Sequence, residues 1–217
     1  MKLPRELRSL VKHSVVILGQ VLQKELGEKA YQRIEEIRSA MVEIRDVAPA
    51  AALLKLQSNY KKLESLKPKE RHDVAHAFTL MLELMNSCEN AYRSHRLNLK
   101  SSVLPESETP AELPKGIVYV LTAHPTEARS PQNIVCFHEI QNILITILER
   151  SKNIPDPEQE IEFSSTDRET LLHALEIAWR TPINRNRSPK VKDEAEHIYS
   201  LLFRDEIFFS LISQNGI

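Results

Sequence analysis

Apolar residues recur at helical spacing through the first part of the chain. They stand mostly three or four positions apart, and Gly27 follows one such run where a glycine often closes a helix. Pro49 and Pro68 mark two further boundaries. The pattern predicts four helices, over about residues 5–26, 28–45, 50–65 and 68–95. Helices joined by such short connections predict a helical bundle over residues 1–97.

The fourth of these helices carries an apolar stripe and two histidines. The stripe predicts a set of core residues, Val74, Phe78, Met81, Leu82 and Met85. His72 and His76 are four positions apart, so they could share a face and bind a metal ion. There is no third ligand in view and no H-E-x-x-H order, which favours a structural role for both histidines.

The pattern changes after residue 97. Residues 98–116 hold three prolines among serines and acidic residues and show no period, which predicts a linker. The run "GIVYVL" that begins at Gly116 is β-branched and aromatic, and it predicts a strand buried on both faces in a parallel sheet. One strand cannot form a sheet alone. We therefore expect the chain to be part of a longer protein that supplies the partner strands.

Helices are predicted again over most of the remaining chain. Ser130 suits the N-cap and Pro131 the first position of a helix that extends to about Leu148. The tetrapeptide Thr166 to Glu169 has the form of a capping box and starts a helix that reaches about Trp179. A last helix is expected over about 192–213, after a basic loop punctuated by proline.

Composition narrows the class of protein. The 217 residues include only 4 glycines, which fits a chain of long helices with few turns. The 29 basic and 30 acidic residues nearly cancel, so the overall charge favours neither a nucleic acid nor a membrane surface. The charged residues near the amino terminus argue against a secretory signal, and no apolar run reaches the length of a membrane span. We expect a cytoplasmic protein in which Cys88 and Cys136 are buried free thiols.

Candidate chemistry gathers just after the predicted strand. Pro125 restricts His124 to extended backbone, which holds its imidazole at the strand's carboxyl end, where parallel α/β proteins carry reactive groups. Thr122 and Thr126 flank the histidine, and the next helix begins shortly afterwards, so the arrangement suits proton transfer near a carboxylate or a phosphate. The alternative is a loop histidine hydrogen-bonded to a neighbouring turn.

Three segments resemble those of a known enzyme family. "VLTAHPTE", from Val120 to Glu127, is similar to the signature of the phosphoenolpyruvate carboxylases, in which an apolar strand ends in T-A-H-P-T-E or T-A-H-P-T-Q. Residues 14–28 resemble the helix that opens that family, and residues 178–195 resemble its Trp-x-Thr segment. The resemblance covers most of the chain but only the amino-terminal portion of a family protein.

The resemblance implies both a fold and an activity. The fold would be mainly α: an amino-terminal helical bundle followed, over residues 117–217, by the first strand and helices of an α/β barrel. The full-length enzymes add bicarbonate to phosphoenolpyruvate, giving oxaloacetate and phosphate, so the activity would be that of a carbon-carbon lyase. His124 matches the family's essential histidine, which acts as the base. The resemblance implies that Arg185 binds substrate, and that Arg129, one position before the family's usual basic pair, does so as well.

The resemblance also implies cofactors and partners. The full-length enzymes use Mg²⁺ or Mn²⁺, whose ligands would lie outside this chain, so no metal is expected to bind here. Phosphoenolpyruvate and bicarbonate would be the ligands of the whole protein, and family members are commonly homotetramers. We expect the 217-residue chain alone to be inactive, with no role in binding nucleic acid or membranes.

The chain departs from the family pattern in two places. The family usually has two basic residues where this chain has Ser130 and Pro131, and it usually has Asp-Glu where this chain has Pro182 and Ile183. These departures leave open a second hypothesis, a non-catalytic helical scaffold or interaction module derived from the family.

Two further alternatives concern single features. A phosphohistidine carrier would use His124 beside the following helix N-terminus. The basic loop over residues 180–192 could face a phosphate or a nucleic acid, although a solvated loop is favoured because the net charge is near zero.

Overall fold

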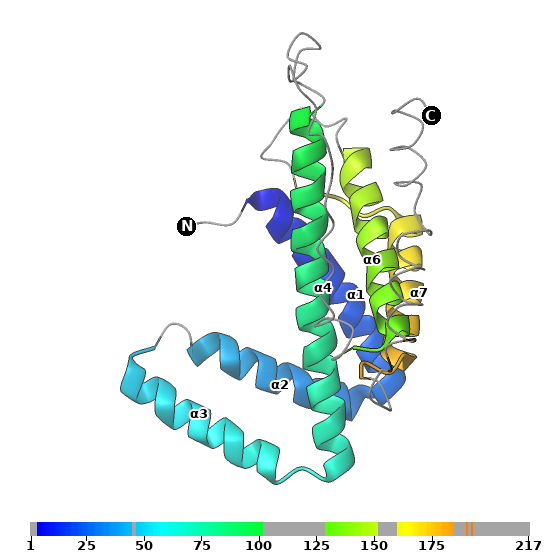
Figure 1. The fold of residues 1–217 in the computed structure, drawn as a ribbon. Helices are drawn as coiled ribbons and strands as arrows, with labels where there is room; N and C mark the ends of the chain where they lie inside the picture. Colours follow the sequence, from blue (N-terminus) through cyan, green and yellow to red (C-terminus); the bar gives the residue numbers. More distant parts are fainter. Residues whose placement is uncertain are drawn as a thin grey trace. The chain divides into compact units, whose positions relative to one another are not determined.

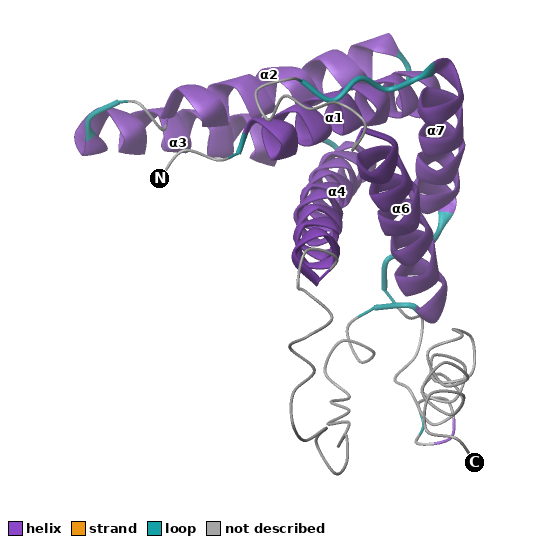
Figure 2. Cartoon of the chain, turned by 90° about the horizontal axis from the view of Figure 1, so that it is seen from above, coloured by secondary structure: helices purple, strands orange, loops and turns teal. Residues whose placement is uncertain are grey.

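The described part of the chain is helical. The computed structural model describes residues 4–44, 47–101, 129–151, 160–184, 190 and 192. Its helices are α1 (Arg5–Leu26), α2 (Glu28–Ile44), α3 (Pro49–Glu64), α4 (Pro68–Ser101), α6 (Pro131–Arg150) and α7 (Ser165–Arg180). Figure 2 shows helices and loops but no strand among these residues. The mainly helical character is thus confirmed, whereas the predicted strand after Gly116 and the last helix beyond Lys192 lie outside the described residues.

The chain forms two compact units. The first unit comprises Met1–Val103 and Phe137–Trp179, and the second comprises Leu104–Cys136 and Arg180–Ile217. The helices α1 to α4 therefore share a unit with most of α6 and α7. The domain boundaries predicted at residues 97 and 116 stay a prediction.

Helix α1 is the core of the first unit. Its buried side chains Leu10, Ile17 and Val21 are at most 1% exposed, as the amphipathic pattern predicts. Figure 1 shows α1 beside α4. Gly27 ends the helix with a φ of 80°, a left-handed conformation that glycine adopts without strain, so the predicted glycine stop is confirmed.

Contacts distant in sequence join α1 to the segment around α7. The hydroxyl of Ser9 donates a 3.1 Å hydrogen bond to the carbonyl of Ile161. The ring of His13 stacks on Phe163 with centroids 5.1 Å apart. Near the other end of α1, the Lys24 ammonium lies 2.6 Å from a carboxylate oxygen of Glu176. These contacts hold both ends of α1 against the segment that contains α7.

Helices α2 and α3 form a hairpin at one end of the unit (Figure 1). Helix α2 approaches α1 closely at Gly19, where an added Cβ would lie 3.1 Å from the Tyr31 hydroxyl oxygen. Helix α3 buries only Asn59 and leaves Leu54 and Tyr60 68% and 62% exposed. Its stability in this chain therefore depends on α2 rather than on a core of its own.

The buried face of α4 differs from the predicted stripe. Its core positions carry small as well as large residues, namely Val74, Ala77, Leu80, Leu84, Cys88 and Ala91. Leu82 and Met85, predicted to be core residues, are 56% and 40% exposed, so the prediction was wrong for both. The physical reason is helix geometry: the buried positions recur every three or four residues, and Leu82 stands two positions from both Leu80 and Leu84, which places it on a different face.

Both later helices begin with a side-chain cap. The predicted N-cap Ser130 is confirmed, because its hydroxyl oxygen accepts a 3.1 Å hydrogen bond from the N–H of Asn133. The predicted capping box at α7 was misplaced by two residues. The box consists of Ser164 and Asp167: the Ser164 N–H donates to the Asp167 carboxylate at 3.0 Å, and the Asp167 N–H donates to the Ser164 hydroxyl oxygen at 3.1 Å.

Candidate functional site

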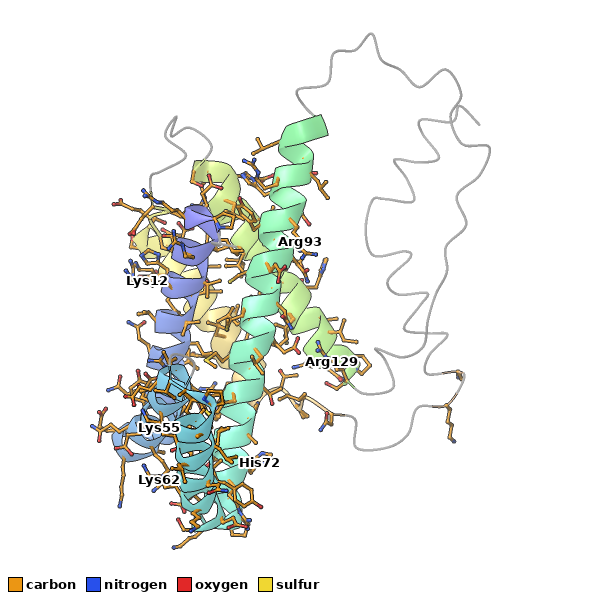
Figure 3. The ribbon with its side chains drawn as sticks, turned by 90° about the vertical axis from the view of Figure 1, so that its left-hand side faces the viewer. Lys12, Lys55, Lys62, His72, Arg93 and Arg129 are labelled. Atoms are coloured by element: carbon orange, nitrogen blue, oxygen red, sulfur yellow. The ribbon has the colours of Figure 1, made fainter. Side chains whose placement is uncertain are left out.

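The described part of the candidate site begins just after the histidine motif. His124 and Arg185 lie outside the described residues. Arg129 is described; it is half-buried and directly precedes Ser130 at the start of α6 (Figure 3). The catalytic role of His124 and the substrate-binding roles of Arg129 and Arg185 stay predictions.

Ser130 joins the start of α6 to the turn that follows α7. Its backbone N–H donates a 2.8 Å hydrogen bond to the carbonyl of Ile183. Its hydroxyl donates a 2.5 Å hydrogen bond to the carbonyl of Pro182. Since Ser130 is only 5% exposed, these bonds are shielded from competing water. The two segments therefore meet at a single buried residue within the second unit.

A thiol contact adds to this junction. The Cys136 sulfur lies 3.6 Å from the hydroxyl oxygen of Thr181, which is within the range of a weak hydrogen bond. Cys136 is a free, half-buried thiol, whereas Cys88 is free and fully buried. Thr181, Pro182 and Ile183 thus all bond to the start of α6, either through its N-cap Ser130 or through Cys136.

The junction unites the two sequence departures noted above. Ser130 and Pro131 form one of them, and Pro182 and Ile183 form the other. Ser130 of the first departure donates hydrogen bonds to the carbonyls of both residues of the second. Sequence reasoning identified each departure and the N-cap but missed the pairing, because no local pattern shows which carbonyl a capping hydroxyl will also reach.

The tryptophan of the Trp-x-Thr segment has a partner in the first unit. The ring of Trp179 stacks on His76, with centroids 4.3 Å apart and planes 13° apart. The ring of His72 lies 5.9 Å from that of His76 and is tilted by 58°. Figure 3 shows His72 toward the amino-terminal end of α4. A role in packing against tryptophan, rather than in binding metal, is what this arrangement supports for His76.

Burial disfavours the charged form of His76. Desolvation lowers the pKa of its imidazole, and the neighbouring His72 lowers it further, whereas Asp73 acts in the opposite direction. The Nε2 atom of His76 is buried and has no hydrogen-bond partner among the described residues. A neutral ring stacked on an indole accommodates such an atom better than a charged ring would.

The described residues offer no metal centre and no membrane segment. Within these ranges, no three histidine, cysteine, aspartate or glutamate side chains come together as metal ligands. None of the described helices is both long enough and apolar enough to cross a membrane.

Comparison with known proteins identifies the family. The family model described as phosphoenolpyruvate carboxylase matches residues 7–118 and 113–214. These two matches span nearly the whole chain, including "TAHPTE" and the junction at Ser130. The chain therefore belongs to the phosphoenolpyruvate carboxylase family.

Individual relatives agree with this assignment. The phosphoenolpyruvate carboxylases of Paraburkholderia xenovorans and Burkholderia mallei are each 28% identical to this chain, over 88% of its length. The corresponding protein of Burkholderia vietnamiensis is 26% identical over the same share. The chain spans about a fifth of the length of these curated relatives, since it covers 21% of each. No solved structure gives a significant match.

Proposed function

We propose that this chain is the amino-terminal part of a phosphoenolpyruvate carboxylase, which joins bicarbonate to phosphoenolpyruvate and releases oxaloacetate and phosphate. The observation that carries the proposal is the family match over nearly the whole chain. The sequence "TAHPTE" supports it further, because it retains the histidine on which we expect the chemistry to depend.

The proposed reaction needs one base at a defined moment. Bicarbonate attacks the phosphorus of phosphoenolpyruvate, the bond from phosphorus to the enol oxygen breaks, and carboxyphosphate and the enolate of pyruvate form. His124 then takes the carboxyl proton of carboxyphosphate, so that CO₂ leaves and phosphate remains. The enolate carbon attacks CO₂ to form oxaloacetate. A histidine suits this step because its ordinary pKa lies close to neutral pH.

Positive charge must accompany the two anionic substrates. Arg129 and Arg185 are the proposed phosphate-binding side chains of this chain, since guanidinium groups bind phosphate through paired hydrogen bonds. A divalent metal would supply additional charge neutralisation in the whole protein. Within the described ranges no metal-ligand set gathers, and we propose that the ligands of this ion lie outside this chain.

Oxaloacetate formation tests this proposal. The assay couples oxaloacetate to malate dehydrogenase and compares the 217-residue chain with the protein from the complete reading frame. We expect activity in the longer protein only, and we expect His124→Asn to lower kcat by at least about a hundredfold. His138→Asn is the matched control, because His138 is an exposed histidine on α6.

Two outcomes would argue against the proposal. Full activity in His124→Asn would remove the histidine from the mechanism. No carboxylation by a folded protein from the complete reading frame would favour the alternative, a family-derived scaffold without catalysis.

A further inference from the structure

We propose that Ser130 is a positioning residue, which fixes the turn at residues 181–183 against the start of α6 and thereby positions Arg129, the neighbouring residue proposed to bind substrate. The inference rests on the proposed function. It adds a role for a residue that is not among the candidate site residues His124, Arg129 and Arg185.

The first argument is the completeness of the bonding at Ser130. Its hydroxyl has one proton, which it donates to the Pro182 carbonyl at 2.5 Å. The same oxygen accepts a hydrogen bond from the N–H of Asn133 at 3.1 Å. The backbone N–H of Ser130 donates to the carbonyl of Ile183. A single side chain thus caps a helix and holds a second segment at the same time.

The second argument concerns which residue types can make these bonds. A hydroxyl accepts from an N–H and donates to a carbonyl through the same oxygen atom. An ionised aspartate accepts but cannot donate, and alanine does neither. Because Ser130 is 5% exposed, water cannot easily replace the lost partner of the Pro182 carbonyl. Threonine retains the hydroxyl and therefore both functions.

The third argument is the stiffness of the joined segments. Pro131 occupies the first position of α6, where its fixed φ favours the helix start. Pro182 fixes φ in the facing turn. With both backbones restricted, a bond between them holds a defined geometry rather than a flexible contact.

The fourth argument is proximity along the chain to the predicted site residues. Arg129 is the residue directly before Ser130, and His124 lies six positions before it. Arg185 lies two positions after Ile183. Loss of the junction would therefore displace the backbone that carries Arg129, and a displacement of about 1 Å can cost about a hundredfold in rate.

The test uses the protein from the complete reading frame with Ser130→Ala, Ser130→Thr and a matched control, Ser87→Ala. Ser87 is also buried, but its hydroxyl bonds only to the Glu83 carbonyl within its own helix. Assays run at 25 °C, well below the Tm of each variant. We expect Ser130→Ala to lower kcat/KM by about ten- to a hundredfold and to raise KM for phosphoenolpyruvate. Ser130→Thr should recover activity to within about threefold, and Ser87→Ala should leave KM unchanged.

Hydrogen exchange gives a readout that does not depend on activity. In Ser130→Ala, amides in peptides spanning residues 129–136 and 181–184 should exchange faster than in Ser87→Ala. Equal exchange in these peptides, or unchanged kcat/KM in an active protein, would overturn the positioning role. A wild-type protein without carboxylation would instead refute the proposed function, and with it the catalytic meaning of the junction, whereas the exchange result would still decide whether Ser130 holds the turn.

Discussion

Truncating one leucine on α4 distinguishes the observed buried face from the face that the sequence predicted. Leu80 is completely buried, whereas Leu82, two positions later on the same helix, is 56% exposed. Leucine and alanine are both strong helix formers, and any difference in propensity is the same at both positions. The difference between Leu80→Ala and Leu82→Ala therefore reports the packing of the two faces.

The magnitude follows from the burial. Leu80→Ala removes a fully buried side chain and leaves a cavity, which costs about 2.7–5 kcal/mol in free energy of unfolding. Leu82→Ala should cost less than about 0.5 kcal/mol, because the side chain is more than half exposed. For a chain of this size, a loss of about 3 kcal/mol corresponds to a fall in Tm of about 6–12 °C.

The assay is unfolding of the chain by urea and by heat, followed by far-ultraviolet circular dichroism. We expect the Leu80→Ala midpoint to fall clearly while the slope with urea stays constant, so that the shift reports stability. Equal shifts in the two variants, or a larger shift in Leu82→Ala, would refute the reasoning about which face of α4 is buried.

Three other predictions concern single residues of the described helices. Burial raises the pKa of the Cys88 thiol to about 11, so iodoacetamide at pH 8 should modify Cys136 but not Cys88 in the native chain, and both in urea; rapid native labelling of Cys88 would contradict this. Burial lowers the pKa of His76 below its ordinary 6.5, so the unfolded chain binds a proton first as the pH falls, and stability should decrease from pH 7 towards pH 5. The fluorescence of Trp179, the sole tryptophan, should follow unfolding by urea at each pH. His76→Phe should reduce the dependence of stability on pH between pH 7 and pH 5. The same pH dependence in His76→Phe and the wild type would contradict the prediction. Asp167→Ala should cost about 1–3 kcal/mol because Asp167 caps α7 and pairs with Arg150, whereas Thr166→Ala, at an exposed position, should be nearly neutral in the same urea titration; the reverse order would restore the predicted capping box.

Local signals were sufficient to predict most of the helices. The spacing of apolar residues and the glycine at position 27 predicted α1 well, because an amphipathic helix buries a periodic stripe and ends where a left-handed residue is tolerated. Pro131 and Ser130 likewise predicted the start of α6. In each case the determining interactions lie within one turn of the sequence.

Tertiary contacts were harder to predict. The stripe on α4 was misassigned because Leu82 and Met85 are large apolar side chains, whereas Ala77 and Cys88, which are buried instead, give a weaker apolar signal. The stacking of Trp179 on His76 joins positions far apart in sequence, and no local pattern encodes it.

The candidate site shows the same division. The motif around His124 and the family resemblance were readable from the sequence, and the family is confirmed. The bonds from Ser130 to Pro182 and Ile183 were not, because they depend on how the end of α7 meets the start of α6. The two departures from the family pattern, at residues 130–131 and 182–183, are thus joined by hydrogen bonds in the structure.

Incorporation of labelled bicarbonate tests most directly whether the protein carboxylates phosphoenolpyruvate with His124 as the base. The protein from the complete reading frame is incubated with phosphoenolpyruvate and ¹⁴C-bicarbonate, and oxaloacetate is trapped as malate. We expect one labelled carbon for each phosphate released, with both products reduced by at least about a hundredfold in His124→Asn. Phosphate release without incorporated label, or unchanged incorporation in His124→Asn, would contradict it.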